Sequence, residues 1–129
     1  MLILISDAFD SSLPGILSHY GEVTDDKSRL PDADIVLVRS KTTADRAYLD
    51  SAKNLKLIIR GGVGMDNIDI PYAQSRGVDC RNTADASTTA VAELAMALMI
   101  TLPNKIVMAD TALHQGKWLK KEAERTELF

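Results

Sequence analysis

Short apolar runs recur along the chain, and each is followed by polar residues or glycine. Three runs, from Leu2 to Ser6, Ile35 to Val38 and Leu55 to Ile59, are continuous and rich in isoleucine, leucine and valine. Such runs are typical of strands that are buried on both faces, as in a parallel sheet covered by helices. Weaker signals at Val23 and from Val78 to Arg81 predict two further strands near the edges of the sheet.

Helical patterns lie between the predicted strands. Three of them begin after residues that can cap a helix: Ser11 or Ser12 with Pro14 in the first turn, Thr43 before residues 44–52, and Asp69 before residues 70–76, where Gly77 ends the pattern. The alternation of strands and helices predicts an α/β fold, a flavodoxin-like or Rossmann-like three-layer sandwich. We expect a five-stranded parallel sheet of order 2-1-3-4-5 with right-handed crossovers.

The longest helical pattern follows the last predicted strand. It begins at Ser87 or Thr88, and apolar residues form a wide stripe along it. Pro103 removes one helical hydrogen bond, so we predict that the helix is kinked or broken near that residue. The pattern resumes after the proline and continues to Gly116.

Composition is that of an ordinary soluble domain: of the 129 residues, 46% are hydrophobic and 26% are charged. A net charge of -3 with both signs mixed gives no reason to expect a nucleic acid or a membrane as partner. Cys80 is the single cysteine, which excludes an internal disulfide framework, and neither His19 nor His114 has neighbours at metal-ligand spacing. The N-terminus lacks the basic start of a signal peptide, and the apolar run over 91–102 is too short to span a bilayer. We therefore expect a cytoplasmic protein without a metal site.

A glycine-rich stretch follows the third of the continuous runs: Arg60-Gly61-Gly62-Val63-Gly64-Met65-Asp66-Asn67. Glycines allow positive φ angles and let amide N–H groups converge on an anion. In open α/β sheets, ligands bind outside the carboxyl ends of the strands, where this loop falls. The stretch is not a G-x-G-x-x-G fingerprint, and the chain contains none. The pattern alone fits an anion-binding loop and an ordinary tight turn equally well.

A second candidate, Arg39-Ser40-Lys41, follows the run over 35–38, again at a carboxyl end. A guanidinium binds a carboxylate or phosphate with two parallel hydrogen bonds, and Ser40 and Lys41 add a donor and a charge. A lone arginine at such a place is more often part of a surface ion pair. Two anion-competent loops at one sheet edge together favour a small anionic ligand. No residue is placed to make either histidine catalytic, so no catalytic residue is assigned.

At the glycine loop the sequence resembles the D-isomer-specific 2-hydroxyacid dehydrogenase family, especially its phosphoglycerate-oxidising members. The resemblance covers nearly the whole chain: Val38-Arg39-Ser40, the run from Leu55 to Asp69, Arg76-Gly77, Asn82-Thr83, Val91-Ala92-Glu93-Leu94 and Gly116-Lys117-Trp118. The glycine loop together with Ala92-Glu93-Leu94 is its most specific part. Two departures are small, because Gly61 stands where the family often has alanine, and Ala84 where a proline often follows the Asn-Thr pair.

The resemblance implies an oxidoreductase with two Rossmann-like domains, which transfers a hydride between NAD and a small anionic 2-hydroxy acid in the cleft between them. It implies that the substrate carboxylate is held by backbone amides around Gly61, Gly62, Val63 and Gly64. It also places Val63 close to the nicotinamide. Arg39 and Ser40 would face the distal group of the substrate. That group is a phosphate if the substrate is 3-phosphoglycerate, at the start of serine biosynthesis.

The resemblance further implies that residues 1–102 are a substrate-binding domain and that residues 103–129 continue the long helix and lead into a cofactor domain. The catalytic arginine, glutamate and histidine of the family fall beyond residue 129. We therefore expect a truncated domain that is inactive by itself, which NAD reduction by the pure chain would contradict. The whole enzyme would be a homodimer or homotetramer. In this chain, residues 103–116 would cover the sheet or pair with a second copy, and a monomer with a projecting helix in scattering data would contradict both.

Two alternatives stay open. A stand-alone flavodoxin-like binding or signalling module is one, although a receiver domain needs an aspartate where Arg39 stands. A flavodoxin needs a hydroxyl-rich phosphate loop after the first strand, whereas the stretch from Ser6 to Ser11 is acidic. The other alternative is a polypeptide made to study folding or evolution, without activity of its own.

Overall fold

The computed structural model describes residues 1–124 and 126–127. The chain forms two compact units, a first from Met1 to Ala86 and a second that begins at Ser87. The predicted functional boundary between residues 102 and 103 stays a prediction. The predicted tail includes residues 125, 128 and 129, which lie outside the described residues.

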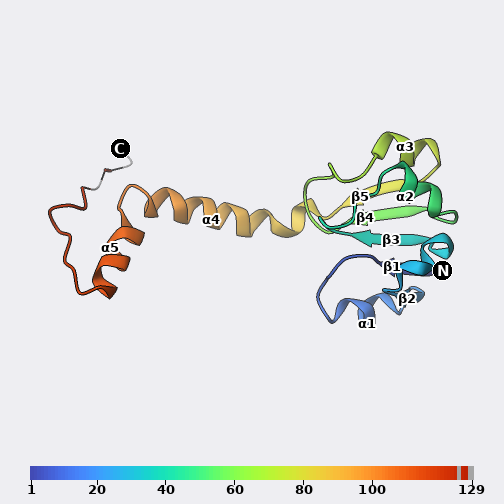
Figure 1. Cartoon of the computed structure of the whole chain (residues 1–129), viewed down its shortest axis with the longest axis horizontal. Helices are drawn as coiled ribbons and strands as arrows, with labels where there is room; N and C mark the ends of the chain where they lie inside the picture. Colours follow the sequence, from blue (N-terminus) through green and yellow to red (C-terminus); the bar gives the residue numbers. More distant parts are fainter. Residues whose placement is uncertain (125, 128–129) are drawn as a thin grey trace. The chain divides into compact units, whose positions relative to one another are not determined.

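A five-stranded parallel sheet forms the centre of the first unit (Figure 1). Its strands are β1 (Leu2–Ile5), β2 (Glu22–Thr24), β3 (Ile35–Val38), β4 (Leu57–Arg60) and β5 (Asp79–Asn82). Their order is β2-β1-β3-β4-β5, as predicted. The three continuous apolar runs therefore became the three central strands, and the two weaker signals became the edge strands.

Helices lie on both sides of the sheet, which confirms the predicted three-layer arrangement. The first unit contains α1 (Leu13–Leu17), α2 (Arg46–Ser51), α3 (Ile70–Ser75) and the 3-10 turn η1 (Lys27–Asp32), and a second 3-10 turn, η2 (Ala84–Ser87), crosses the boundary between the units. On one face, Leu4, Val36 and Ile58 are fully buried in a core that includes Leu49 of α2 and Ala73 of α3. On the other face, Ile5 of β1 and Pro14 of α1 line one pocket, so α1 lies on that side.

Two local predictions differ from the structure. Thr43 does not cap the second helix; Asp45 does, accepting a hydrogen bond from the Tyr48 amide. The reason is tertiary, because Ala44 forms an isolated parallel bridge with Ile68 and cannot also begin a helix. Between β2 and β3 the strand–helix alternation predicts an α-helix, but the structure has η1, which contains Pro31.

The third predicted cap is confirmed. Asp69 accepts a hydrogen bond from the Tyr72 amide at the start of α3, and Gly77 follows the helix with a φ of 77°. At α1, Ser12 is the N-cap, but its side chain makes no capping bond to the helix and instead donates to Asp10. The local patterns therefore located these helix ends well, even where the bonding differs.

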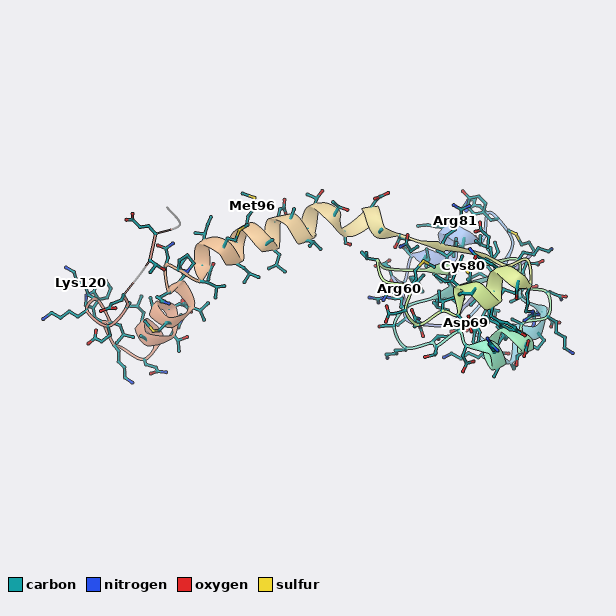
Figure 2. The ribbon with its side chains drawn as sticks, turned by 90° about the horizontal axis from the view of Figure 1, so that it is seen from above. Arg60, Asp69, Cys80, Arg81, Met96 and Lys120 are labelled. Carbon is teal, nitrogen blue, oxygen red and sulfur yellow. The ribbon has the colours of Figure 1, made fainter. Side chains whose placement is uncertain are left out.

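The second unit contains α4 (Thr88–Thr101) and α5 (Ile106–His114). The predicted break near Pro103 is confirmed, with a bend of 71° between the two helical segments and a positive φ of 54° at Lys105. Large apolar side chains on both helices are exposed, and Figure 2 shows those of α4, including the labelled Met96, projecting on several sides of the helix. Pairing of this helical region with a second copy stays a prediction.

Among the described residues, no single helix is long and apolar enough to span a membrane. The helical segments 84–101 and 106–114 have the required length and composition only when taken together across their bend.

Candidate functional site

Three loops meet at the carboxyl edge of the sheet because β1, β3 and β4 are neighbours. They carry Asp7 after β1, Arg39 after β3 and Gly61 after β4. The Arg39 amide donates to Asp7 Oδ2 at 2.5 Å, and Arg39 Cγ lies 3.4 Å from where a side chain on Gly61 would begin. The structure therefore brings together the two loops that the sequence singled out, as expected for consecutive strands of a parallel sheet.

Asp7 ties the loop after β3 to the end of β1. Its carboxylate accepts hydrogen bonds from the amides of Arg39 and Thr42 and from the Thr42 hydroxyl, the last at 2.7 Å. Burial opposes ionisation of this carboxyl, but the hydrogen bonds from Thr42 and Arg39, with the charge of Lys27, lower its pKa below the ordinary value. Asp7 is therefore ionised at neutral pH and fixes the conformation around Arg39.

Asn67 ties the glycine loop to the same segment. Its Nδ2 donates to the carbonyl oxygens of Arg39 and Thr42, both at 2.7 Å. The Ala44 amide donates to the Asn67 carbonyl at 2.8 Å, so main chain and side chain of Asn67 both hold the loop after β3. Asn67 Oδ1 is buried without a hydrogen-bond partner among the described atoms. Sequence reasoning assigned no role to Asn67, although it is the last residue of the glycine-rich stretch.

The four amides of the glycine loop have different surroundings. The Gly61 amide donates to Val38 O at 2.8 Å, extending the pairing of β4 with β3. The Gly62 amide donates to Thr83 Oγ1 at 3.0 Å. Within the described part of the chain, the amides of Val63 and Gly64 have no hydrogen-bond partner, and both residues are exposed. The loop therefore presents two amides that can donate to an anion, while the other two hold its shape.

Residues after β5 brace this loop. Asn82 Nδ2 donates to Val63 O at 2.7 Å, and the Thr83 amide donates to Gly62 O at 3.2 Å. The sequence resemblance includes the Asn82-Thr83 pair but implies no role for it. Its contacts show why these two residue types are needed there, since an amide and a hydroxyl satisfy loop groups that lie beyond the end of the sheet.

Two arginines stand beside the loop. Arg39 is exposed, with its guanidinium 5.9 Å from the centre of the Phe9 ring and Nη1 donating to Ala8 O, which leaves further N–H groups for a ligand. Arg60, at the end of β4 (Figure 2), has a buried Nε without a partner among the described residues. Its guanidinium occupies the space where a side chain on Gly62 would lie. The Arg60 side chain therefore packs against the glycine loop at Gly62.

Val63 is the exposed apolar residue of the glycine loop. Its side chain is 56% exposed, and its proximity to the nicotinamide stays a prediction. The sequence contains no G-x-G-x-x-G turn to hold a pyrophosphate. Among the residues that the structure describes, no group of three or more histidine, cysteine, aspartate or glutamate side chains could hold a metal ion.

The family model for the D-isomer specific 2-hydroxyacid dehydrogenase catalytic domain matches residues 4–126. The chain belongs to this family. Among curated relatives, it is 37% identical to D-3-phosphoglycerate dehydrogenase of Methanocaldococcus jannaschii over 135 residues, which cover 98% of this chain and 26% of that protein. It is 42% identical to hydroxypyruvate reductase of Thermotoga maritima over 100 residues, covering 78% of this chain and 33% of that protein. The chain thus spans a third or less of the length of these relatives.

Solved structures share the fold. The D-lactate dehydrogenase of Aquifex aeolicus, in complex with NAD and lactic acid, superimposes with a TM-score of 0.85 at 20% identity, over 99% of this chain and 41% of that one. A 2-hydroxyacid dehydrogenase from Ketogulonicigenium vulgare superimposes with a TM-score of 0.79 at 27% identity, over 98% of this chain and 44% of that one.

Proposed function

We propose that this chain supplies the substrate-binding half of an NAD-dependent D-2-hydroxyacid dehydrogenase, with 3-phosphoglycerate as substrate in the cytoplasm. The observation that carries the proposal is the pair of unpartnered amides at Val63 and Gly64, beside the exposed guanidinium of Arg39. The relatives named D-3-phosphoglycerate dehydrogenase support the choice of substrate.

In this proposal each end of the substrate meets its own group of donors. The amides of Val63 and Gly64 donate to the carboxylate, and Gly61 and Gly62 shape the loop through their bonds to Val38 and Thr83. Arg39 and Ser40 bind the phosphate, because a guanidinium fork and a hydroxyl match phosphate oxygens. The hydrogen bonds that Asp7 accepts and that Asn67 donates would then set the distance between the two binding groups.

NAD, when bound, would supply the hydride acceptor. The contribution of this chain would be an apolar contact from Val63, which helps to exclude water from the reacting carbon. The residues that hold the rest of the dinucleotide would have to come from elsewhere in the enzyme, since this chain has no phosphate-binding fingerprint. No residue of this chain is proposed to transfer a proton.

A second candidate substrate is hydroxypyruvate, favoured by the relative from Thermotoga maritima. Hydroxypyruvate and its reduced form, glycerate, carry the carboxylate without the phosphate. The two candidates therefore differ in whether Arg39 and Ser40 are needed for binding. A ligand series with and without phosphate distinguishes them.

An amide NMR titration of the pure chain with 3-phosphoglycerate tests the proposal. Peaks of Arg39, Ser40, Val63 and Gly64 are expected to shift saturably. Arg39→Gln is expected to weaken binding about fivefold, because a charge in contact with a phosphate contributes about 1 kcal/mol in water. Lys53→Gln is the control for net charge, because Lys53 is exposed and lies in the α2–β4 connection, at the other edge of the sheet.

Two other outcomes are informative. Well-dispersed peaks that do not move would contradict the idea that this chain alone holds its half of the site. Glycerate shifts that equal those of 3-phosphoglycerate, in both the wild-type chain and Arg39→Gln, would replace the phosphorylated substrate by the hydroxypyruvate–glycerate pair.

A further inference from the structure

A second pocket, apart from the site at the glycine loop, also lies at the carboxyl edge of the sheet. It is on the opposite face of the sheet from Arg39. It has a volume of about 240 Å³ and is lined by Ser6, Lys27, Lys41, Thr43 and Tyr48, among others. Successive side chains along a strand point to opposite faces of the sheet, so Arg39 and this pocket lie on different faces. Leu4 belongs to the core on the α2–α3 face, and Ser6 follows it on the same side. Arg39 comes directly after the core residue Val38 and points to the other face, toward Phe9 and Gly61.

The structure thus divides the Arg39-Ser40-Lys41 motif between two faces. Arg39 lies beside the glycine loop, whereas Lys41 lines the second pocket. This pocket also lies between the loops after β1 and β3. At this position the strand order reverses: the connection after β1 leads to β2 on one side, and the connection after β3 leads to β4 on the other side. Open α/β sheets leave room for ligands at such a position.

Two lysines give the pocket its charge. In the part of the chain that the structure describes, neither Lys27 nor Lys41 forms an ion pair within 4.0 Å, whereas Arg29, Lys56 and Arg76 of the same unit each pair with a carboxylate. The charge of Lys27 contributes to the lowered pKa of the Asp7 carboxyl. The oxygens of Asp7, however, already accept three hydrogen bonds from Arg39 and Thr42. Two exposed lysines from separate segments therefore line the pocket without an ion pair in the described part of the chain, and the oxygens of Asp7 are otherwise engaged.

Two hydroxyl groups lie in the wall of the pocket. Ser6 is 6% exposed, and its Oγ lies 3.0 Å from Tyr48 Oη. One hydrogen bond between two hydroxyls uses only one of their two hydrogens, so the other is left to donate. Burial raises the pKa of the Tyr48 phenol, which keeps this hydroxyl protonated at neutral pH. The wall of the pocket therefore contains a neutral donor beside the two cations.

We propose that this pocket binds a small oxyanion of the phosphate class, held between the Lys27 and Lys41 ammonium groups with a hydrogen bond from the Ser6–Tyr48 hydroxyl pair. Two cations and a hydroxyl donor match a tetrahedral anion. The anion is either inorganic phosphate or the phosphate of a small metabolite. This site is separate from the one proposed for the substrate and does not depend on it.

A titration of the whole 129-residue chain with inorganic phosphate, followed by amide NMR at constant ionic strength, tests the site. Saturable shifts are expected at Ser6, Thr43 and Tyr48. Lys27→Gln and Lys41→Gln are each expected to weaken binding about fivefold, the effect of removing one contacting charge in water. Tyr48→Phe, which keeps the ring, is expected to weaken it less. Lys53→Gln is the matched control and is expected to change nothing.

Shifts that never saturate, or equal weakening by Lys53→Gln, would overturn the proposal, because either result indicates general attraction to positive charge. Glycerol 3-phosphate in place of phosphate distinguishes the two sources of the anion: tighter binding of the ester identifies a metabolite, and equal binding identifies free phosphate. Arg39→Gln separates this proposal from the substrate site. It should leave phosphate binding at Lys27 and Lys41 intact even if 3-phosphoglycerate fails to bind beside Arg39.

Discussion

Replacing Asn67 by aspartate is expected to destabilise the fold by about 2–4 kcal/mol at neutral pH, the usual effect of leaving a buried polar or charged group without partners. The side chain keeps its size but loses its N–H donors. In the wild-type chain, Asn67 Nδ2 donates to the carbonyl oxygens of Arg39 and Thr42. A carboxylate oxygen at that place would face two acceptors. The other oxygen would inherit the buried position of Oδ1, which has no donor among the described residues.

The effect of this substitution should depend on pH in a defined direction. Burial and the facing carbonyls favour the neutral acid, so the folded-state pKa of the new carboxyl lies above its unfolded value of about 3.9. The loss of stability relative to the wild-type chain is therefore smallest below about pH 4. It grows as the pH rises through the interval between the two pKa values and is constant above the folded-state value.

Denaturant unfolding of the wild-type chain and the Asn67→Asp variant at several pH values measures this difference. Asn54→Asp is the matched control, because Asn54 is exposed in a turn and its substitution should change the free energy of unfolding by less than about 0.5 kcal/mol. A loss for Asn67→Asp that equals that of Asn54→Asp, or one that shrinks as the pH rises, would contradict the assigned role of Asn67.

The second large effect is expected at Gly62, where alanine should cost about 2–4 kcal/mol, combining backbone strain with overpacking. Its φ angle is 151°, in the region that residues with side chains rarely adopt. An added Cβ would also overlap Nη1 of Arg60. Relief of this overlap would require the Arg60 guanidinium to shift although its Nε is buried, and the backbone strain would remain.

Gly61→Ala provides the comparison, since it adds the same methyl group one residue earlier. There the Cβ would lie 2.5 Å from Cε1 of Phe9, the edge of a partly exposed ring that can turn. The φ angle of Gly61 is not positive, so we expect a loss of about 1 kcal/mol or less, as for many single substitutions. Thermal or denaturant unfolding of both variants measures the difference. A larger loss for Gly61→Ala than for Gly62→Ala would show that the strain has been assigned to the wrong glycine.

Binding at the two proposed sites is expected to depend on the same loop, the one after β3. The loop after β3 is held from both sides, by Asp7 of the β1 loop and by Asn67 of the β4 loop. Arg39 and Lys41 extend from that one loop toward opposite faces of the sheet. A substitution that releases the loop, such as Asn67→Asp, should therefore weaken binding at both sites, whereas Arg39→Gln and Lys41→Gln should each affect only one.

Much of the fold was predictable from the sequence by itself. Continuous runs of isoleucine, leucine and valine predicted the three central strands, because strands buried on both faces need apolar side chains on both faces. Asp69 with Gly77, and Pro103, marked helix ends through interactions within a few residues. The glycine loop and Arg39 could be placed at one sheet edge, because strand direction alone puts every loop that follows a parallel strand there.

Only the tertiary structure decided which groups at that edge are available. Nothing near Gly62 in the sequence indicates that its amide is taken by Thr83, or that the amides of Val63 and Gly64 are not taken by any described residue. The start of α2 depended on the pairing of Ala44 with Ile68, and the role of Asn67 on two carbonyls from another loop. The physical reason is the same in each case. A hydrogen bond at a loop is completed by whichever segment the sheet brings alongside, and that segment is distant in the sequence.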